Sequence, residues 1–126
     1  MINLNFPIFF QEYVEKKYEL RIVVFKDKIY SMCIFSQISD QAKFDFREDY
    51  NGIRMVPYIL KQDEICLVKS FMSLIKQDSG SIDLIRNTTG DLVFLEINPT
   101  GQFDFVSKNC NYNIEQEIAN ILINNE

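Results

Sequence analysis

Three oxygen-bearing side chains toward the carboxy terminus could together bind a metal ion. They are Asp83, Glu96 and Asn98, in the segment GSIDLIRNTTGDLVFLEINPTGQF. If residues 80–98 form a hairpin with a four-residue loop at 88–91, position 87 pairs with 92, 85 with 94, and 83 with 96. Asp83 then lies directly across from Glu96, and Asn98 shares their face because strand side chains alternate.

Opposed carboxylates repel each other, because their Cβ atoms are only roughly 5 Å apart. A hard divalent cation with oxygen ligands would compensate this repulsion. Magnesium takes few protein carboxylates and completes its coordination with phosphate oxygens and water, so the set suits an ion shared between protein and ATP. The opposite face of the hairpin is expected to be a core face, made of Ile82, Leu84, Val93, Leu95 and Ile97.

A simpler interpretation is that the three polar residues form a solvent-exposed face of a two-sided strand pair. Periodicity alone favours this alternative, because alternation of polar and apolar residues is what any half-buried strand shows.

The remaining segments predict an α+β domain with antiparallel pairing. Residues 8–14, 20–26 and 29–37 are expected to be strands, the last two joined by a tight turn at Asp27 and Lys28. Residues 38–61 predict a long loop with short extended pieces, and 108–112 a loop into the last helix.

Two helices are expected, each with a capping residue. Apolar side chains at 65, 68, 71, 72 and 75 predict a helix over 63–77, with Asp63 as its N-cap. The tail from 113 predicts a second helix, in which Asn113 and Gln116 have the spacing of a capping box.

Composition excludes several classes of function. Apolar residues make up 47% of the 126 residues and charged residues 25%, as in globular proteins. The net charge of -5 argues against a broad nucleic-acid or anionic-membrane surface, and no targeting or membrane segment is apparent. Because there is no histidine, catalysis by a histidine base is excluded. Cys33, Cys66 and Cys110 are expected to be reduced core thiols of a cytoplasmic protein.

The residues GSIDLI followed by LEINP resemble the magnesium-binding hairpin of the ATP-grasp superfamily, which includes D-alanine–D-alanine ligase and glutathione synthetase. In that superfamily an aspartate, a glutamate and an asparagine at these spacings hold the metal ions. The resemblance therefore implies that Asp83, Glu96 and Asn98 bind Mg²⁺ and that the chain is an ATP-grasp carboxy-terminal subdomain.

The segment FFQEYVEKKYELRIVVF resembles the ATP-grasp hinge, whose main-chain groups bind the adenine edge of ATP. The resemblance implies a hinge at Glu12, Tyr13, Val14 and Glu15, with Glu19 on the ribose hydroxyls. Without the order of the motifs, an ordinary exposed strand face is the favoured explanation of Glu19 and Arg21.

The segment KFDFR resembles a D-[FW]-R stretch whose arginine meets phosphate oxygens. This implies a catalytic role for Arg47, with Arg54 or no ligand at all as alternatives.

The order of these motifs, with NPTGQF after Asn98, is most similar to the grasp-with-spasm and microviridin-type peptide maturases. The resemblance covers nearly the whole chain and implies a ligase that joins side-chain carboxylates of a precursor peptide to its own hydroxyls or amines. Transfer of the γ-phosphoryl group of ATP to the carboxylate would give an acyl phosphate, from which the nucleophile displaces phosphate. Phosphoryl transfer needs mainly positioning and charge neutralisation.

This sequence departs from the family because it begins almost at the hinge, and its four scattered glycines supply no glycine-rich loop. We therefore expect residues 1–126 to be the carboxy-terminal part of an ATP-grasp domain, with the N-terminal part of the enzyme as a missing partner. The chain alone is expected to bind ATP weakly and not to ligate. Alternatives are a ligase that adds amino acids to a small molecule or protein terminus, and a non-catalytic remnant that binds peptide or nucleotide.

Overall fold

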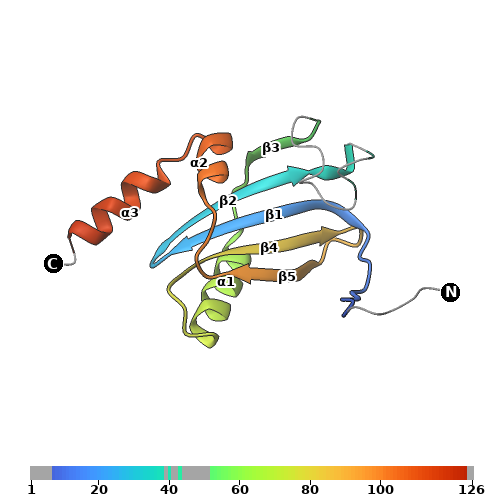
Figure 1. Cartoon of the computed structure of the whole chain (residues 1–126), viewed down its shortest axis with the longest axis horizontal. Coiled ribbons are helices and arrows are strands. Elements are labelled where there is room, and N and C mark those ends of the chain that lie inside the picture. Colours follow the sequence, from blue (N-terminus) through green and yellow to red (C-terminus); the bar gives the residue numbers. More distant parts are fainter. Residues whose placement is uncertain (1–6, 39, 41–42, 44–51, 125–126) are drawn as a thin grey trace.

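The computed structural model describes residues 7–38, 40, 43 and 52–124. Within these residues the chain forms one five-stranded antiparallel sheet in the order β3-β2-β1-β4-β5 (Figure 1). The strands are β1 (Lys16–Phe25), β2 (Lys28–Phe35), β3 (Arg54–Pro57), β4 (Ser79–Asn87) and β5 (Leu92–Asn98). The helices are α1 (Gln62–Leu74), α2 (Asp104–Cys110), α3 (Ile114–Ile123) and the short 3-10 helix η1 (Ser36–Ile38). The predicted α+β class is confirmed.

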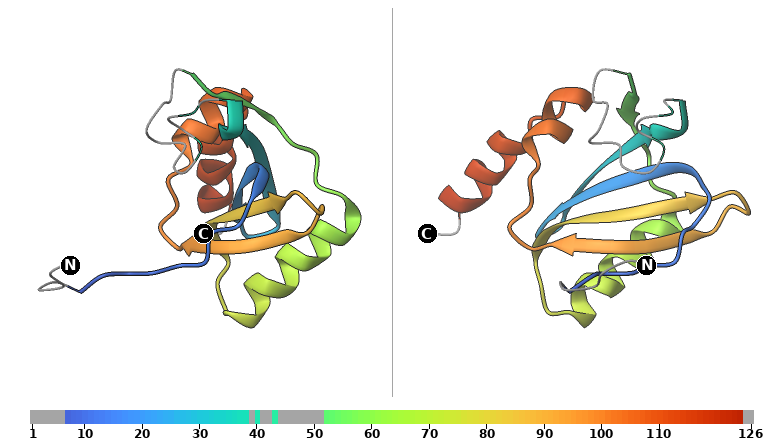
Figure 2. Two further views of the ribbon diagram at one scale, coloured as in Figure 1. Left: turned by 90° about the vertical axis from the view of Figure 1, so that its right-hand side faces the viewer. Right: turned by 45° about the vertical axis from the view of Figure 1, so that its right-hand side comes forward.

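Helices cover both faces of the sheet, with α1 on one side and α2 and α3 on the other (Figure 2). Two hydrophobic cores result, because the central strands β1 and β2 bury side chains in both directions. The α1 core contains Leu20, Ile22, Val24, Cys33, Val68, Met72, Ile82 and Leu84. The α2–α3 core contains Val23, Met32, Ile34, Val106, Cys110 and Ile114.

The β1–β2 hairpin forms as the sequence predicts, but its turn lies one residue earlier. Phe25 pairs with Lys28, so Lys26 and Asp27 make the turn, and Lys26 takes a left-handed conformation with φ of 54°. The strand predicted at 8–14 is wrong: residues 7–15 have no regular secondary structure. The polar residues after it begin β1 instead, because Lys16 and Glu19 find partners inside the fold.

Helix α1 has the predicted buried stripe but a different start. Val68 and Met72 are buried against the sheet. Asp63 is not the N-cap: Lys61 holds that position, and its backbone N–H donates to the Glu64 carboxylate over 2.9 Å. Asp63 lies in the first turn, where its negative charge still interacts favourably with the helix dipole.

Helix α2 includes residues 108–110 of the loop expected at 108–112, and Asn111 ends it in a left-handed conformation with φ of 54°. Asn113 precedes α3 without a side-chain cap, and Gln116 donates to Asn120 instead of completing a capping box. Asn113 thus holds the N-cap position that the sequence predicted, but without the capping-box hydrogen bonds.

The expectation of three core thiols is correct for two of them. Cys33 and Cys110 are buried, whereas Cys66 lies on the exposed side of α1, and all three are unpaired.

Candidate active site

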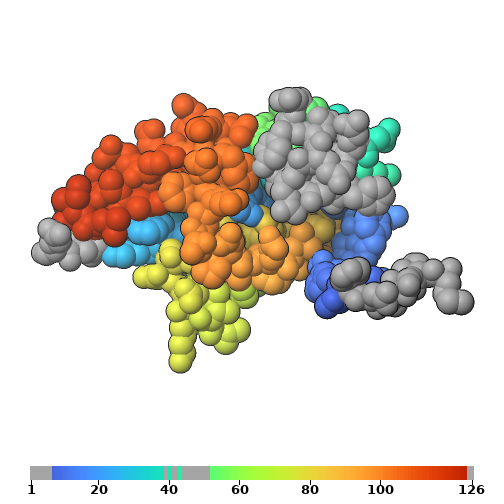
Figure 3. All heavy atoms as spheres, in the orientation of Figure 1, coloured from blue at the N-terminus to red at the C-terminus, as the bar shows by residue number. Residues whose placement is uncertain are grey.

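A cavity of about 500 Å³ lies beside α2, on the α2–α3 face of the sheet. Its walls come from residues 11–14, from strands β1, β4 and β5, and from Gln102. The lining residues are Gln11, Glu12, Tyr13, Val14, Lys16, Glu19, Arg21, Asp83, Ile85, Leu95, Glu96, Asn98 and Gln102. In the space-filling view the N-terminal segment, in dark blue, lies at the end of the sheet beside β5 (Figure 3). A cavity of this volume is in the usual range for small-molecule sites.

The three predicted metal-binding residues lie on one wall of this cavity. Asp83 pairs directly with Glu96, as the hairpin register required, and Asn98 pairs with Ser81 two positions away. The interpretation of these residues as one exposed polar face is wrong for Asp83, whose side chain keeps only 17% of its exposure. Asn98 is half-buried, and its Oδ1 accepts hydrogen bonds from the Thr100 N–H over 3.2 Å and from the Thr100 hydroxyl over 2.9 Å.

A β-bulge follows the carboxylate pair and changes the rest of the predicted register. The irregularity lies between Asp83 and Leu84, so Ile85 pairs with Val93, not with residue 94. Leu95 therefore lines the polar cavity, and Val93 shares the face of Ile85, so neither belongs to the expected core face. Leu92 packs against the α1 core instead, and Phe94 packs on Phe71 of α1. Bulges re-aim side chains in this way.

Arg21 of β1 pairs across the strands with Asp83 and forms an ion pair with its carboxylate. Its guanidinium also lies 5.4 Å from the ring centroid of Phe105 in α2, a cation–π contact. Burial raises the pKa of Asp83 above its ordinary value; the Arg21 guanidinium opposes this rise, and the Glu96 carboxylate adds to it. Arg21 thus supplies part of the charge compensation that the carboxylate pair needs.

Glu19 also lines the cavity, is buried and is held by two donors. Its Oε1 accepts from the Lys16 ammonium over 2.6 Å and from the Ser36 hydroxyl over 2.7 Å. Glu19 and Arg21 are 7% and 6% exposed, so the alternative of an exposed strand face is wrong for both. A carboxylate fixed by buried donors is a rigid hydrogen-bond acceptor, as recognition of a ribose would require.

The profile of the RimK-like ATP-grasp domain matches residues 1–122. The chain belongs to the RimK-like ATP-grasp family. Solved ATP-grasp structures also resemble it. The RiPP-associated ATP-grasp ligase of Chryseobacterium gregarium, solved with ADP and a leader and core peptide, is 32% identical over 92% of this chain, with a TM-score of 0.80. The macrocyclase MdnC of Microcystis aeruginosa, bound to its precursor peptide MdnA, is 33% identical over 90%, with a TM-score of 0.74.

The ATP-grasp ligase PsnB, complexed with a minimal precursor, Mg and ADP, shares the fold at 18% identity over 90% of this chain, with a TM-score of 0.70. This chain spans only about a third of each of these three proteins, namely 36%, 35% and 34% of their lengths. It is therefore a partial ATP-grasp domain. No curated protein sequence matches it significantly.

The other ATP-grasp residues predicted from the sequence are placed as follows. Glu12, Tyr13 and Val14 line the cavity, whereas Glu15 does not. Arg47 lies outside the described residues. Arg54, the alternative to Arg47, is exposed on the edge strand β3.

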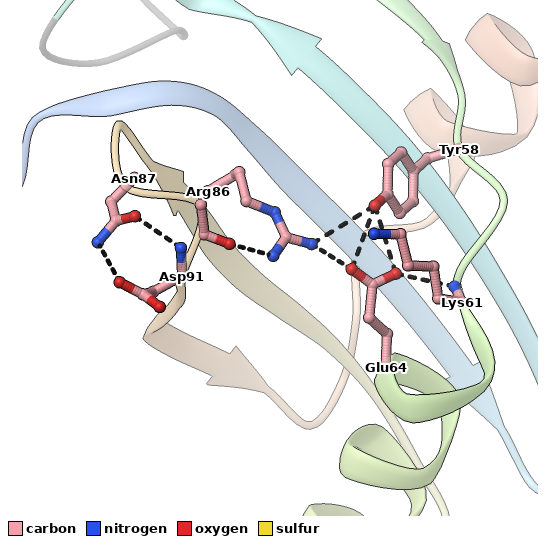
Figure 4. A network of polar contacts seen from close by, with 7 residues as sticks. Tyr58, Lys61, Glu64, Arg86, Asn87 and Asp91 are labelled. Atoms are coloured by element: carbon pink, nitrogen blue, oxygen red, sulfur yellow. Dashed lines mark hydrogen bonds and ion pairs between the residues drawn. The ribbon is translucent and has the colours of Figure 1, made fainter.

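A buried polar network on the opposite face fixes the ATP-grasp hairpin to α1 (Figure 4). Arg86 of β4 forms an ion pair with Glu64 and reaches the Tyr58 hydroxyl over 3.5 Å. Its other amino group donates to the Gly90 carbonyl of the β4–β5 turn over 2.7 Å. Arg86 thus ties the hairpin that carries the carboxylates to helix α1.

Sequence reasoning did not assign a function to three residues that line the cavity or hold its side chains in place. They are Lys16, Arg21 and Ser36. Charged residues in a strand are normally assigned to its solvent side, and nothing local shows that this face is covered by α2 and η1. The signal that could have found Arg21 is its position two residues after Glu19, which puts both side chains on one face of β1.

The donor set fits a hard divalent cation. Asp83 and Glu96 offer carboxylate oxygens and Asn98 an amide oxygen on one cavity wall. Among the described residues no three His, Cys, Asp or Glu side chains gather closely enough to hold a metal unaided. A site with only two acids matches an ion that takes its remaining ligands from phosphate and water.

No helix among the described residues has both the length and the apolar character needed to span a membrane.

Proposed function

We propose that this chain forms the magnesium- and adenine-binding part of an ATP-dependent ligase that modifies a ribosomally made peptide. One observation carries the proposal: seven of the residues assigned from the ATP-grasp resemblance line a single cavity. They are Glu12, Tyr13, Val14, Glu19, Asp83, Glu96 and Asn98. Support for a peptide substrate comes from the two relatives above 30% identity, which were solved with precursor, leader or core peptides.

Each part of the cavity has a task in binding the nucleotide. Main-chain groups of residues 12–15 would bind the adenine edge, and the carboxylate of Glu19 would accept hydrogen bonds from the ribose hydroxyls. Asp83, Glu96 and Asn98 would hold Mg²⁺, which when bound neutralises charge on the triphosphate. Arg21, buried beside them, would offset further negative charge, and Arg47 would do so at the phosphoryl group in transfer.

The reaction we propose proceeds in two displacements. A carboxylate oxygen of the peptide attacks the γ-phosphorus of ATP, forming an acyl phosphate and releasing ADP. A hydroxyl or amine of the same peptide then attacks the acyl carbon, and inorganic phosphate leaves, which closes an ester or amide ring. Both steps depend on positioning and charge neutralisation, so they need no covalent enzyme nucleophile. The unpaired cysteines accord with a reducing compartment, and we propose that the protein works in the cytoplasm.

The proposal is tested by the binding of ADP with Mg²⁺ to the 126-residue chain. In titration calorimetry we expect Asp83→Asn to weaken binding by at least about tenfold, because a lost contact to a charged group costs roughly 1.5–3 kcal/mol. Asp63→Asn is the matched control, since Asp63 is an exposed aspartate on α1, on the other side of the sheet. Equal affinity of the two variants would refute the assignment.

Catalysis is tested by supplying the amino-terminal two-thirds of a relative, such as the Chryseobacterium gregarium ligase, in trans with its core peptide. We expect ADP release and a mass loss of one water per ring formed, neither of which the chain alone should give. Binding of nucleotide and peptide without ADP release from the mixture would instead indicate a non-catalytic remnant.

A further inference from the structure

A row of three charged side chains crosses the sheet along one wall of the cavity. Arg21 of β1 pairs with Asp83 of β4, and Asp83 pairs in turn with Glu96 of β5. These strands are neighbours in the sheet (Figure 1). Directly paired residues share a face, and all three side chains line the cavity. The row therefore contains one positive and two negative side chains and carries a net negative charge.

Arg21 is held firmly but is not fully satisfied. It is 6% exposed, its Nη1 donates to Asp83 Oδ2, and its guanidinium lies 5.4 Å from the Phe105 ring centroid. Its Nε is buried and has no hydrogen-bond partner among the described residues. An unsatisfied buried donor costs free energy, so a ligand with more acceptor oxygens would bind this guanidinium better than Asp83 alone does.

The ion pair also uses a carboxylate that a metal would need. A divalent cation beside Asp83 would approach the guanidinium, and like charges at such short range repel strongly in a partly buried site. The two cations therefore compete for Asp83 unless further negative charge enters the cavity. A phosphate group supplies that charge and can accept two parallel hydrogen bonds from arginine.

We propose that Arg21 is the resident counter-charge of the Asp83–Glu96 pair and releases Asp83 to a divalent cation only when a phosphate group takes the guanidinium. This inference rests on the proposed function, because it takes the cavity to be the nucleotide site. Its consequence is that metal and nucleotide bind with positive coupling, each weakly without the other. The carboxylates thus stay compensated in the empty chain without attracting free metal.

The test measures Mn²⁺ binding to the full chain by electron paramagnetic resonance, with and without ADP, corrected for the Mn–ADP complex formed without protein. For the unsubstituted chain, ADP should tighten Mn²⁺ binding by about tenfold or more, within the range of ordinary coupling between sites. Arg21→Met keeps the aliphatic stem but removes the charge. It should bind Mn²⁺ alone about tenfold more tightly and lose most of the coupling to ADP.

Two further variants make the result specific. Lys69→Met removes one positive charge from the exposed side of α1 and should behave like the unsubstituted chain. Arg21→Lys keeps the charge without the guanidinium fork, so it should still exclude free Mn²⁺, and it tests the inference even if Arg21→Met does not fold.

The inference is overturned if ADP promotes Mn²⁺ binding equally in the unsubstituted chain and in Arg21→Met. It is also overturned if Arg21→Lys takes up Mn²⁺ alone as readily as it does with ADP. Failure of the proposed function has a different signature: none of the proteins would bind Mn²⁺ even with ADP present.

Discussion

At the scale of single residues, the Asp83–Glu96 pair lowers the stability of the folded chain, although the proposed metal site needs both carboxylates. Two carboxylates face each other across adjacent strands, and burial raises the pKa of Asp83, with Glu96 contributing. A raised pKa means that the folded chain holds this proton more tightly than the unfolded chain does. Ionised Asp83 therefore costs stability at neutral pH, and the cost disappears once the pH falls below the unfolded-state pKa of about 4.

Glu96→Gln should stabilise the metal-free chain at pH 7. Removing a like charge from a cross-strand pair is worth about 0.5 kcal/mol when one partner is exposed, as Glu96 is, which raises the melting temperature by roughly 2 °C. The gain should vanish once the pH falls below the raised pKa of Asp83, because a protonated Asp83 no longer repels the carboxylate across from it. Thermal unfolding followed by circular dichroism at a series of pH values measures it; a gain that stayed constant with pH would contradict the electrostatic explanation.

Glu19 makes a separate prediction about the nucleotide. If its carboxylate accepts hydrogen bonds from the ribose, the chain should bind ADP about tenfold more tightly than 2′-deoxy-ADP, because a hydrogen bond to a charged group is worth roughly 1.5–3 kcal/mol. In Glu19→Gln this preference should shrink to about twofold or less, since the acceptor is then neutral. Calorimetric titrations with both nucleotides test it. An unchanged preference in the variant would assign the ribose to another group.

Sequence could place the carboxylates but not their partners. Alternation along the strands predicted that Asp83, Glu96 and Asn98 share a face, and the structure has them on one cavity wall. The contact of Arg21 with Asp83 depends on how β1 and β4 align, strands separated by 53 residues between Phe25 and Ser79. A local pattern carries no information about such non-local register.

At the scale of elements, the hairpin depends on helix α1 through a buried ion pair. The side chains of Arg86 and Glu64 keep 14% and 5% of their exposure, and the Tyr58 hydroxyl donates to Glu64. Burial raises the pKa of this tyrosine to about 12, so it remains a neutral donor over the physiological pH range. Loss of one ionic partner would leave the other charge buried and uncompensated.

Glu64→Gln should therefore lower the free energy of unfolding by about 3 kcal/mol, a large part of the stability of a small domain. The double variant Glu64→Met, Arg86→Met should recover much of the loss, because an apolar pair of similar volume can replace a buried ion pair. Urea unfolding measures both. A loss below about 1 kcal/mol in the single variant would mean that solvent already screens the pair.

Strands and helices were predicted correctly where one face of the element is buried along its whole length. The prediction failed where the conformation of a segment depends on contacts with another element. The α1 stripe with Val68 and Met72 and the two long hairpins follow from periodicity. Residues 8–14 are apolar enough for a strand, but no neighbouring strand pairs with them in the described part of the chain. Helix α2 is held by burial of Val106 and Cys110 against the sheet, which no local signal shows.

At the scale of the whole molecule, the charge of the chain opposes an anionic ligand. The net charge is -5, and the cavity wall carries the carboxylates of Glu12, Glu19, Asp83 and Glu96 against the cations of Lys16 and Arg21. A nucleotide entering without a divalent cation would therefore be repelled, which supports the proposed coupling of metal and nucleotide binding.

The two-sided arrangement of helices around the sheet makes a prediction about the three thiols. Cys33 lies in the α1 core and Cys110 in the α2–α3 core, and burial raises the pKa of each to about 11. Cys66 lies on the exposed side of α1. At pH 8 the buried thiols hold roughly a hundredfold less thiolate than an ordinary cysteine, and thiolate is the reactive form.

Native chain treated with a disulfide reagent at pH 8 should therefore show one fast-reacting thiol and two that react only as the fold opens, with all three reacting at once in denaturant. Cys66→Ser should abolish the fast phase and leave the slow one unchanged. Because Cys33 and Cys110 belong to different cores, equal rates for their slow reactions would mean that both faces of the sheet open together. A faster Cys110 would mean that the α2–α3 layer, which covers the side of the sheet with the cavity, opens independently of α1.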